Sequence, residues 1–199
     1  MTFWLANKRE GQQSDWIQRF DPRFWSVNFP RPMMARVIST APDALRVDLE
    51  FMRKADLAGL VWESADHLDH PLLAYETQRD YAGTTLAFRW RSSGIIPLDG
   101  INGPTLTIEG RDADGIERVW HIRPWNYATG TPEDAQIVLP FSSLEGGFSL
   151  PDDADPVFPS AIDRMFISLV APDFDADSTE PLAAHVSGWV ELSGITCEG

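Results

Sequence analysis

The stretch DFDADSTE, which begins at Asp173, has carboxylates at a spacing that could bind a metal ion. Its three aspartates occupy positions one, three and five of a calcium-binding loop. Such a loop also needs glycine at position six and a bidentate glutamate at position twelve, where this chain has Ser178 and Ala184. We therefore predict a solvated acidic loop, and the alternative is a structural calcium site.

Histidine and cysteine offer few other metal ligands. In DHLDH (66–70) two histidines lie three residues apart, but zinc requires three or four ligands, so we expect a polar turn before Pro71. His121 and His185 stand alone in the sequence. The single Cys197 excludes a disulfide within the chain and any zinc site with two thiolates.

Motifs for catalysis and for nucleotide cofactors are missing from the sequence. It contains no G-x-S-x-G nucleophile elbow, no G-x-G-x-x-G fingerprint and no P-loop. Many carboxylate pairs are unavoidable among 30 acidic residues, so a glycosidase pair cannot be inferred by counting. We predict no enzymatic activity, no bound metal and no cofactor.

Aromatic and basic residues form the strongest candidate for a binding surface. Alternation through VWHIRPWNY (119–127) directs four side chains to one face, beside two arginines of TLAFRWR (85–91). The predicted ligand-binding face comprises Arg89, Arg91, His121, Arg123, Trp125 and Tyr127. Flat rings suit the apolar faces of sugars, and arginine suits hydroxyls or carboxylated sugars. The alternative is that Trp125 belongs to the core and the arginines pair with acidic residues.

Strands must position these side chains, and the sequence from Thr84 onward predicts them. TLTIEGRDADGIERVWHIR (105–123) is typical of a hairpin with Asp114-Gly115 in its turn. RMFISLVAP (164–172) indicates a central strand that is covered on both faces. The residues expected to point inward are Leu86, Phe88, Trp90, Leu106, Ile108, Trp120, Ile122, Ile137, Leu139 and Phe141, and those expected outward include Thr107 and Glu109. With no long helical periodicity, the chain is predicted to be an all-β, two-sheet antiparallel sandwich.

The N-terminal region differs from the rest. Prolines and aromatics crowd residues 1–40, which we predict to be an extended arm in front of a sandwich domain at 41–199. ALRVDLEFM (44–52) is expected to be the first strand, with alternate residues inward. DLAGLVWES (56–64) and DHPLLAYETQRDY (69–81) fit either a strand or short helices.

Charge excludes one class of partner. The net charge of −14 disfavours a nucleic-acid ligand, which requires a basic surface. Residues 1–54 hold nine Lys and Arg against six Asp and Glu (+3), and residues 55–199 hold seven against twenty-four (−17), so the arm could lie on an acidic body. The start MTFWLANKRE has no basic region followed by a long apolar run, so we predict neither a signal peptide nor a membrane span. We therefore expect no membrane insertion and synthesis in the cytoplasm.

Two family resemblances follow from these segments. Five runs are similar in order and spacing to jelly-roll carbohydrate-binding modules of the galactose-binding-like type: TLAFRWRSSG, TLTIEGRDADGIERVWHIR, DAQIVLPFSSLEGGF, IDRMFISLVAP and GWVELSGI. MTFWLANKREGQQSDWIQRFDPRFWSVNFPRPMMA (1–35) and DHPLLAYETQRDY (69–81) resemble the N-terminal region of alphaproteobacterial prophage proteins named non-contractile tail sheath proteins.

The resemblances carry expectations of fold, partners and function. They imply a jelly-roll sandwich that serves as a structural or interaction domain of a phage-like tail, with a cell-surface glycan as a possible ligand. The partners would be other tail subunits or a following domain of a longer parent protein, and the location would be a phage or phage-like particle. The alternative function is that of a carbohydrate-binding module joined to a barrel resembling glycoside hydrolases.

Overall fold

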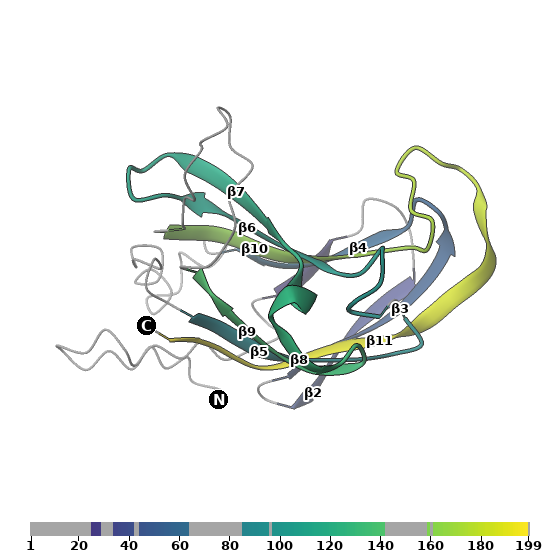
Figure 1. Cartoon of the computed structure of the whole chain (residues 1–199). Helices are drawn as coiled ribbons and strands as arrows, with labels where there is room; N and C mark the ends of the chain where they lie inside the picture. Colours follow the sequence, from purple (N-terminus) through teal and green to yellow (C-terminus); the bar gives the residue numbers. More distant parts are fainter. Residues whose placement is uncertain are drawn as a thin grey trace.

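A computed structural model describes residues 25–28, 34–41, 44–63, 85–95, 97–141, 159 and 161–198. The described elements are strands, together with one short 3-10 helix, and they lie in two layers (Figure 1). In chain order they are β1 (Trp25–Asn28), β2 (Met34–Ala41), β3 (Ala44–Arg53), β4 (Leu57–Glu63), β5 (Thr85–Ser93), β6 (Thr105–Arg111), β7 (Glu117–Ile122), η4 (Pro124–Tyr127), β8 (Ala128–Thr131), β9 (Asp134–Pro140), β10 (Ala161–Val170) and β11 (Pro181–Glu198). Among the described residues, no helix has the length and apolarity needed to cross a membrane.

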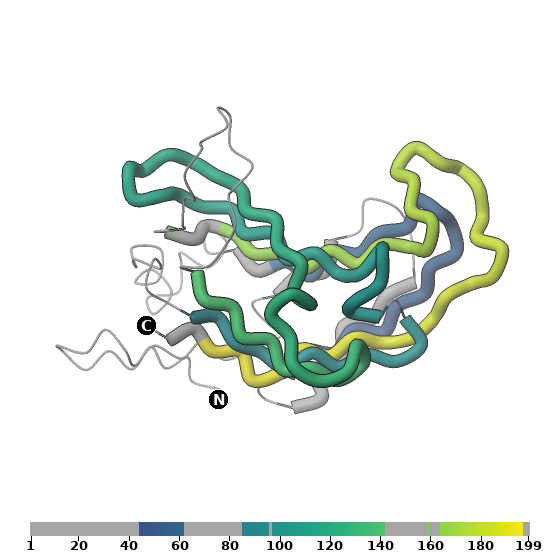
Figure 2. Tube along the Cα trace, viewed as in Figure 1, coloured from purple at the N-terminus to yellow at the C-terminus, as the bar shows by residue number. Residues whose placement is uncertain are grey.

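The strands form two antiparallel sheets. One has five strands in the order β1-β4-β10-β6-β7, and the other has six in the order β2-β3-β11-β5-β9-β8. The chain crosses between the sheets at most of its connections, as in a jelly roll. The predicted all-β, two-sheet sandwich is therefore confirmed. The connection from β10 to β11 projects at one end of the sandwich (Figure 2).

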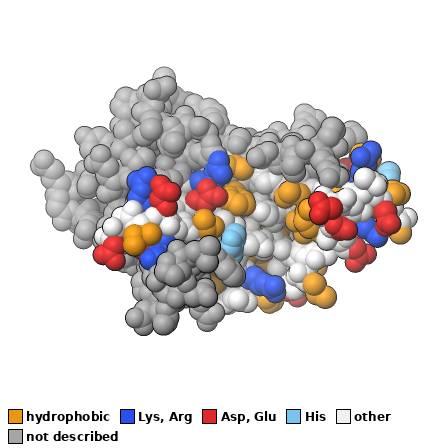
Figure 3. Space-filling view, turned by 90° about the horizontal axis from the view of Figure 1, so that it is seen from above, with side chains coloured by type: hydrophobic (Ala, Val, Ile, Leu, Met, Phe, Trp, Pro, Cys, Tyr) orange, Lys and Arg blue, Asp and Glu red, His pale blue; other side chains and the backbone are white. Residues whose placement is uncertain are grey.

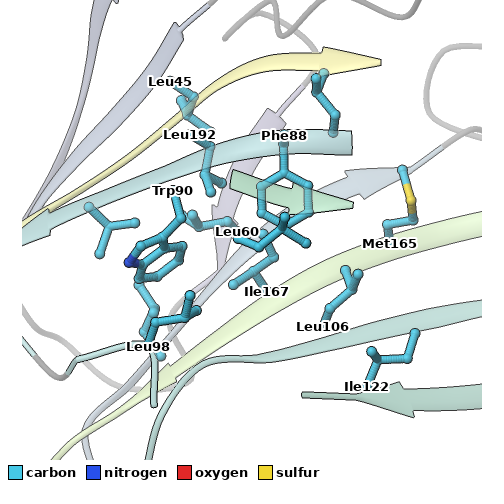
Figure 4. Close-up of a cluster of buried hydrophobic side chains, with 14 of the residues drawn as sticks. Leu45, Leu60, Phe88, Trp90, Leu98, Leu106, Ile122, Met165, Ile167 and Leu192 are labelled. Atoms are coloured by element: carbon cyan, nitrogen blue, oxygen red, sulfur yellow. The ribbon is translucent and has the colours of Figure 1, made fainter. Parts of the chain in front are cut away.

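Alternation along the strands builds the core between the sheets. Every second residue of a strand points to the same side, so a strand with one apolar parity buries that parity. Figure 4 shows side chains of both sheets, such as Phe88 and Trp90 from β5 and Ile167 from β10, directed into one cluster. All ten residues expected to point inward are buried in this cluster. The same holds for β3, where Leu45, Val47, Leu49 and Phe51 are buried as expected.

The predicted β6–β7 hairpin is also confirmed. Ile108 pairs with Trp120 in an antiparallel register. Gly115 has a φ of +77°, which favours glycine at the turn. Thr107 faces the outer side of the sheet as expected, but the residue is only 2% exposed. Its neighbours Phe166 on β10 and His121 on β7 flank it.

Two expectations for the strands need correction. β10 is central in its sheet as predicted, but only its inner face is fully buried, and Phe166 on its outer face is partly exposed. β3 is the third strand and not the first, because β1 and β2 precede it. DLAGLVWES, which fitted a strand or a helix, forms β4.

β1 and β2 lie inside the segment predicted to be an extended arm. β1 pairs with β4 at one edge of the five-stranded sheet, and β2 pairs with β3 at one edge of the six-stranded sheet. β2 also runs across the boundary placed at residue 40. The rest of the predicted arm, and the stretches at 66–70 and 69–81, lie outside the described residues.

Candidate functional site

The six residues of the predicted ligand-binding face do not share one face. Arg89 and Arg91 lie on β5, whose neighbours are β11 and β9, whereas His121 lies on β7, which pairs with β6 in the other sheet. Their outward sides therefore belong to opposite surfaces of the sandwich. Alternation predicts which side of its own strand a residue occupies, but it does not tell which strands are neighbours. The predicted single face is thus wrong.

The alternation also ends before Trp125. β7 stops at Ile122, and Pro124 begins the 3-10 helix η4, consistent with the preference of proline for the first turn of a helix. Trp125 and Tyr127 in this helix are partly buried and pack against the core. The alternative interpretation of Trp125, as a residue of the core, is closer to the structure than a fully outward stacking platform.

His121 and Arg123 remain on the side of the five-stranded sheet. The His121 Nδ1 atom lies 3.1 Å from Thr107 Oγ1, and both His121 and Arg123 are exposed. Figure 3 views the molecule from this side and shows basic and acidic side chains intermixed. One such pair is Arg164 with Glu109, whose charged atoms lie 3.4 Å apart. This surface offers hydrogen-bonding groups and the imidazole ring of His121, whereas Trp125 and Tyr127 pack against the core.

Arg89 and Arg91 are held by carboxylates of the neighbouring strands. Arg89 donates to both oxygens of Asp134 on β9, at 2.9 and 2.8 Å, and Arg91 donates to Glu191 on β11 at 3.1 Å. The hydrogen bond with Arg89 lowers the pKa of Asp134, and the same bond raises the pKa of Arg89. Arg89 and Arg91 are therefore paired with acidic residues, which was the alternative to their role in a ligand-binding face.

The sheet register extends these pairs into a row of alternating charge. Arg46 on β3, Glu191 on β11, Arg91 on β5 and Asp134 on β9 are direct neighbours across four strands. We name the outer surface around this row the arginine face, which comprises Arg46, Asp48, Arg89, Arg91, Asp134, Trp189 and Glu191. Three positive and three negative side chains balance one another on this face, in a chain whose net charge is −14.

Trp189 supplies the aromatic ring of the arginine face and was not among the predicted site residues. Val190 and Leu192 share one side of β11 and are both buried, so Trp189 points to the outer side of this strand. The guanidinium of Arg46 lies 4.4 Å from the centroid of the ring. The signal for Trp189 was present in GWVEL, where buried Val190 separates the outward Trp189 and Glu191.

The acidic loop at Asp173 is exposed and satisfied by its own chain. Asp175 Oδ1 accepts the backbone N–H of Asp177 at 3.1 Å, and Lys54 donates to Glu180 at 2.6 Å. This bond to Glu180 raises the pKa of Lys54. Within the described ranges, no group of three His, Cys, Asp or Glu side chains is arranged to hold a metal ion.

Comparison with known protein families identifies the family of this chain. A family model described as the non-contractile tail sheath N-terminal domain matches residues 17–199. The chain belongs to this family. The resemblance that the N-terminal segments indicated is thus confirmed.

The tail sheath domain also resembles solved structures with which it shares low sequence identity. A family 30 carbohydrate-binding module of a cellulosomal cellulase of Clostridium thermocellum shares 13% identity, with a TM-score of 0.43 and coverage of 83% of this chain and 82% of that one. A family 28 module specific for non-crystalline cellulose shares 8% identity, with a TM-score of 0.40 and 89% coverage of both chains. These scores are too low to carry an argument about function.

Proposed function

We propose that this chain is a non-catalytic structural domain of a phage-like tail, which packs against other tail subunits or against a following domain of its own protein. The family match over residues 17–199 is the observation that carries the proposal. The fold supports it as well, because a sandwich with a closed core provides a stiff unit with two broad outer faces.

The N-terminal segment is the part of the chain that we propose contacts the neighbours. It is basic relative to the rest of the chain, since residues 1–54 carry a net +3 and residues 55–199 carry a net −17. Opposite charges on two parts of one chain favour contact between copies of that chain or with another acidic subunit. β1 and β2 belong to this segment and pair with β4 and β3, each at an edge of its sheet.

Truncation of the tail protein in its phage-like particle tests this proposal. Deletion of residues 1–24 leaves β1 and β2 in place and should reduce the yield of tailed particles while the domain still unfolds cooperatively. Deletion of residues 1–30 is the less selective comparison, because it also removes β1 and its pairing with β4. Normal tailed particles from the 1–24 deletion would exclude the N-terminal contact, and normal particles without residues 1–199 would exclude the structural role itself.

A second function, glycan binding, is favoured by one observation. The arginine face brings Trp189 together with paired charged groups on adjacent strands, which is the mixture of ring and hydrogen-bonding groups that sugar recognition needs. Arg89 and Arg91 of the predicted site belong to this face, whereas the other four predicted residues do not. Binding of the 199-residue chain to a glycan array tests this second function.

A further inference from the structure

Trp189 occupies the middle of the six-stranded sheet on its outer side. Asp48 on β3 and Ser93 on β5 are its direct neighbours across the two adjoining strands. The ring is partly exposed, and the guanidinium of Arg46 lies 4.4 Å from its centroid. Arg46 in turn donates from Nε to Asp48 Oδ1 at 3.1 Å. We refer to Arg46, Asp48 and Trp189 together as the Trp189 cluster.

The Trp189 cluster keeps hydrogen-bonding capacity that its own chain does not use. In the part of the chain that the structure describes, the bond from Arg46 to Asp48 is the only side-chain hydrogen bond of the cluster. The indole N–H of Trp189 therefore has no partner there, whereas the N–H of buried Trp90 reaches Ser92 Oγ at 3.3 Å. The terminal amino groups of Arg46 and the second oxygen of Asp48 are likewise available to a ligand.

The unused groups select for a particular ligand chemistry. Arg46 and Trp189 offer donors, and Asp48 offers an acceptor a short distance away. A hydroxyl group both donates and accepts, so neighbouring hydroxyls can satisfy all three residues. A carboxylate would accept a hydrogen bond from Arg46 but would be repelled by Asp48. An ammonium group would donate to Asp48 but would be repelled by Arg46.

The charged pairs on the rest of the arginine face also disfavour an acidic ligand. Arg91 is paired with Glu191, and Arg89 is paired with Asp134 through two bonds. An acidic ligand would therefore have to displace a carboxylate that is already in place. The expectation that these arginines suit carboxylated sugars loses its basis once both are paired.

We propose that the Trp189 cluster binds a neutral, hydroxyl-rich carbohydrate chain and discriminates against acidic ones. This inference rests on the glycan-binding function proposed above and assigns it a ligand class and residues. The aromatic ring provides a flat apolar surface for the C–H face of a sugar, and the Arg46–Asp48 pair provides the polar contacts.

Calorimetric titration of the 199-residue chain with matched neutral and acidic oligosaccharides tests the proposal. The neutral probes are galactan, mannan, xylan and glucan oligosaccharides, and the acidic probe is oligogalacturonate. We expect binding of at least one neutral probe and at least tenfold weaker binding of oligogalacturonate. Trp189→Ala should weaken the neutral interaction at least tenfold, whereas His121→Ala, on the opposite sheet, should change it less than twofold.

Two further variants separate recognition from folding. Trp189→Phe retains a flat ring without the indole N–H and should cause a smaller loss than Trp189→Ala, with an unchanged circular dichroism spectrum. Asp48→Asn removes the repulsive charge and should improve the binding of oligogalacturonate at least threefold, which loss of folding cannot do. If the chain binds only oligogalacturonate, or if His121→Ala removes the binding, this inference is overturned while glycan binding stands. If no probe and no array glycan binds, both fall, and the structural role in the tail is tested separately by the truncations.

Discussion

The turn of the β6–β7 hairpin depends on one buried carboxylate. Asp112 accepts the backbone N–H groups of Asp114 and Ile116, each at 2.9 Å, and the Nε–H of Arg118 at 2.5 Å. The side chains of Asp112 and Arg118 are 3% and 8% exposed. Asp112→Ala removes all three bonds and takes the carboxylate away from a buried guanidinium. Loss of one partner of a buried ion pair costs about 3–5 kcal/mol, so the free energy of unfolding should fall by about that amount.

Urea unfolding monitored by tryptophan fluorescence measures this loss. Asp114→Ala is the matched control, because Asp114 is an exposed acidic residue of the same turn and should change the free energy by less than about 0.5 kcal/mol. In the double variant Asp112→Ala/Arg118→Met the buried cation is gone as well, so it should be more stable than Asp112→Ala alone. A loss below about 1 kcal/mol for Asp112→Ala, or a double variant less stable than the single one, would refute this reasoning.

Other predictions follow from burial, ionisation and the acidic loop. Trp120→Ala, at a side chain with no exposed surface, should lower the free energy of unfolding by about 3–5 kcal/mol in the same urea assay; a loss under about 1 kcal/mol would contradict its place in the core. Trp125→Ala should cost about 1–3 kcal/mol, because the ring is only partly buried, and an unchanged urea midpoint would show that it contributes nothing to packing. The pKa of Asp112 would be raised by burial, but the bonds from Arg118, Ile116 and Asp114 outweigh this and lower it, and Arg89 lowers the pKa of Asp134. Stability from both should therefore be complete above the ordinary carboxyl pKa of about 3.9 and be lost as the pH falls below it, and thermal unfolding at pH 6 and pH 3 should show a smaller drop for Asp112→Asn than for the native chain. Millimolar calcium should leave the melting temperature of the chain within about a degree, because the loop lacks the glycine and distal glutamate of a calcium site, and a large shift that Asp175→Ala removes would reverse that interpretation.

Much of the fold was predictable because a strand encodes its two faces in a short window. Leu106, Ile108, Trp120 and Ile122 all point inward as expected, because the alternation is local and the hairpin turn fixes how β6 meets β7. The turn residues also indicate the hairpin. Asp112 accepts hydrogen bonds from backbone N–H groups of the turn, and Gly115 adopts the positive φ that the turn requires. Where neighbouring strands are also neighbours in sequence, the sequence suffices.

The candidate site was less predictable because it depends on which distant strands pair. β5 lies between β11 and β9, so Arg91 donates to Glu191, a hundred residues further on, and Arg89 donates to Asp134. No pattern within a short stretch of sequence joins β5 to β9 or to β11. Proline at position 124 was a visible signal that the alternation of β7 would end, and it outweighed the apparent continuity to Tyr127.

The arginine face is the place where the two proposed functions compete. Residues 55–199 carry a net −17, so the bodies of two copies repel one another, and this repulsion is least where positive and negative side chains alternate in a row. A neighbouring subunit docked there would cover Trp189 and exclude a sugar. Glycan binding should therefore be measured both on the free chain and on the intact particle. A neutral glycan that binds to both requires the arginine face to point outward in the tail. A glycan that binds only the free chain instead requires that face to be buried between subunits. In the particle the neighbouring subunit would then cover the Trp189 cluster and keep the glycan from binding.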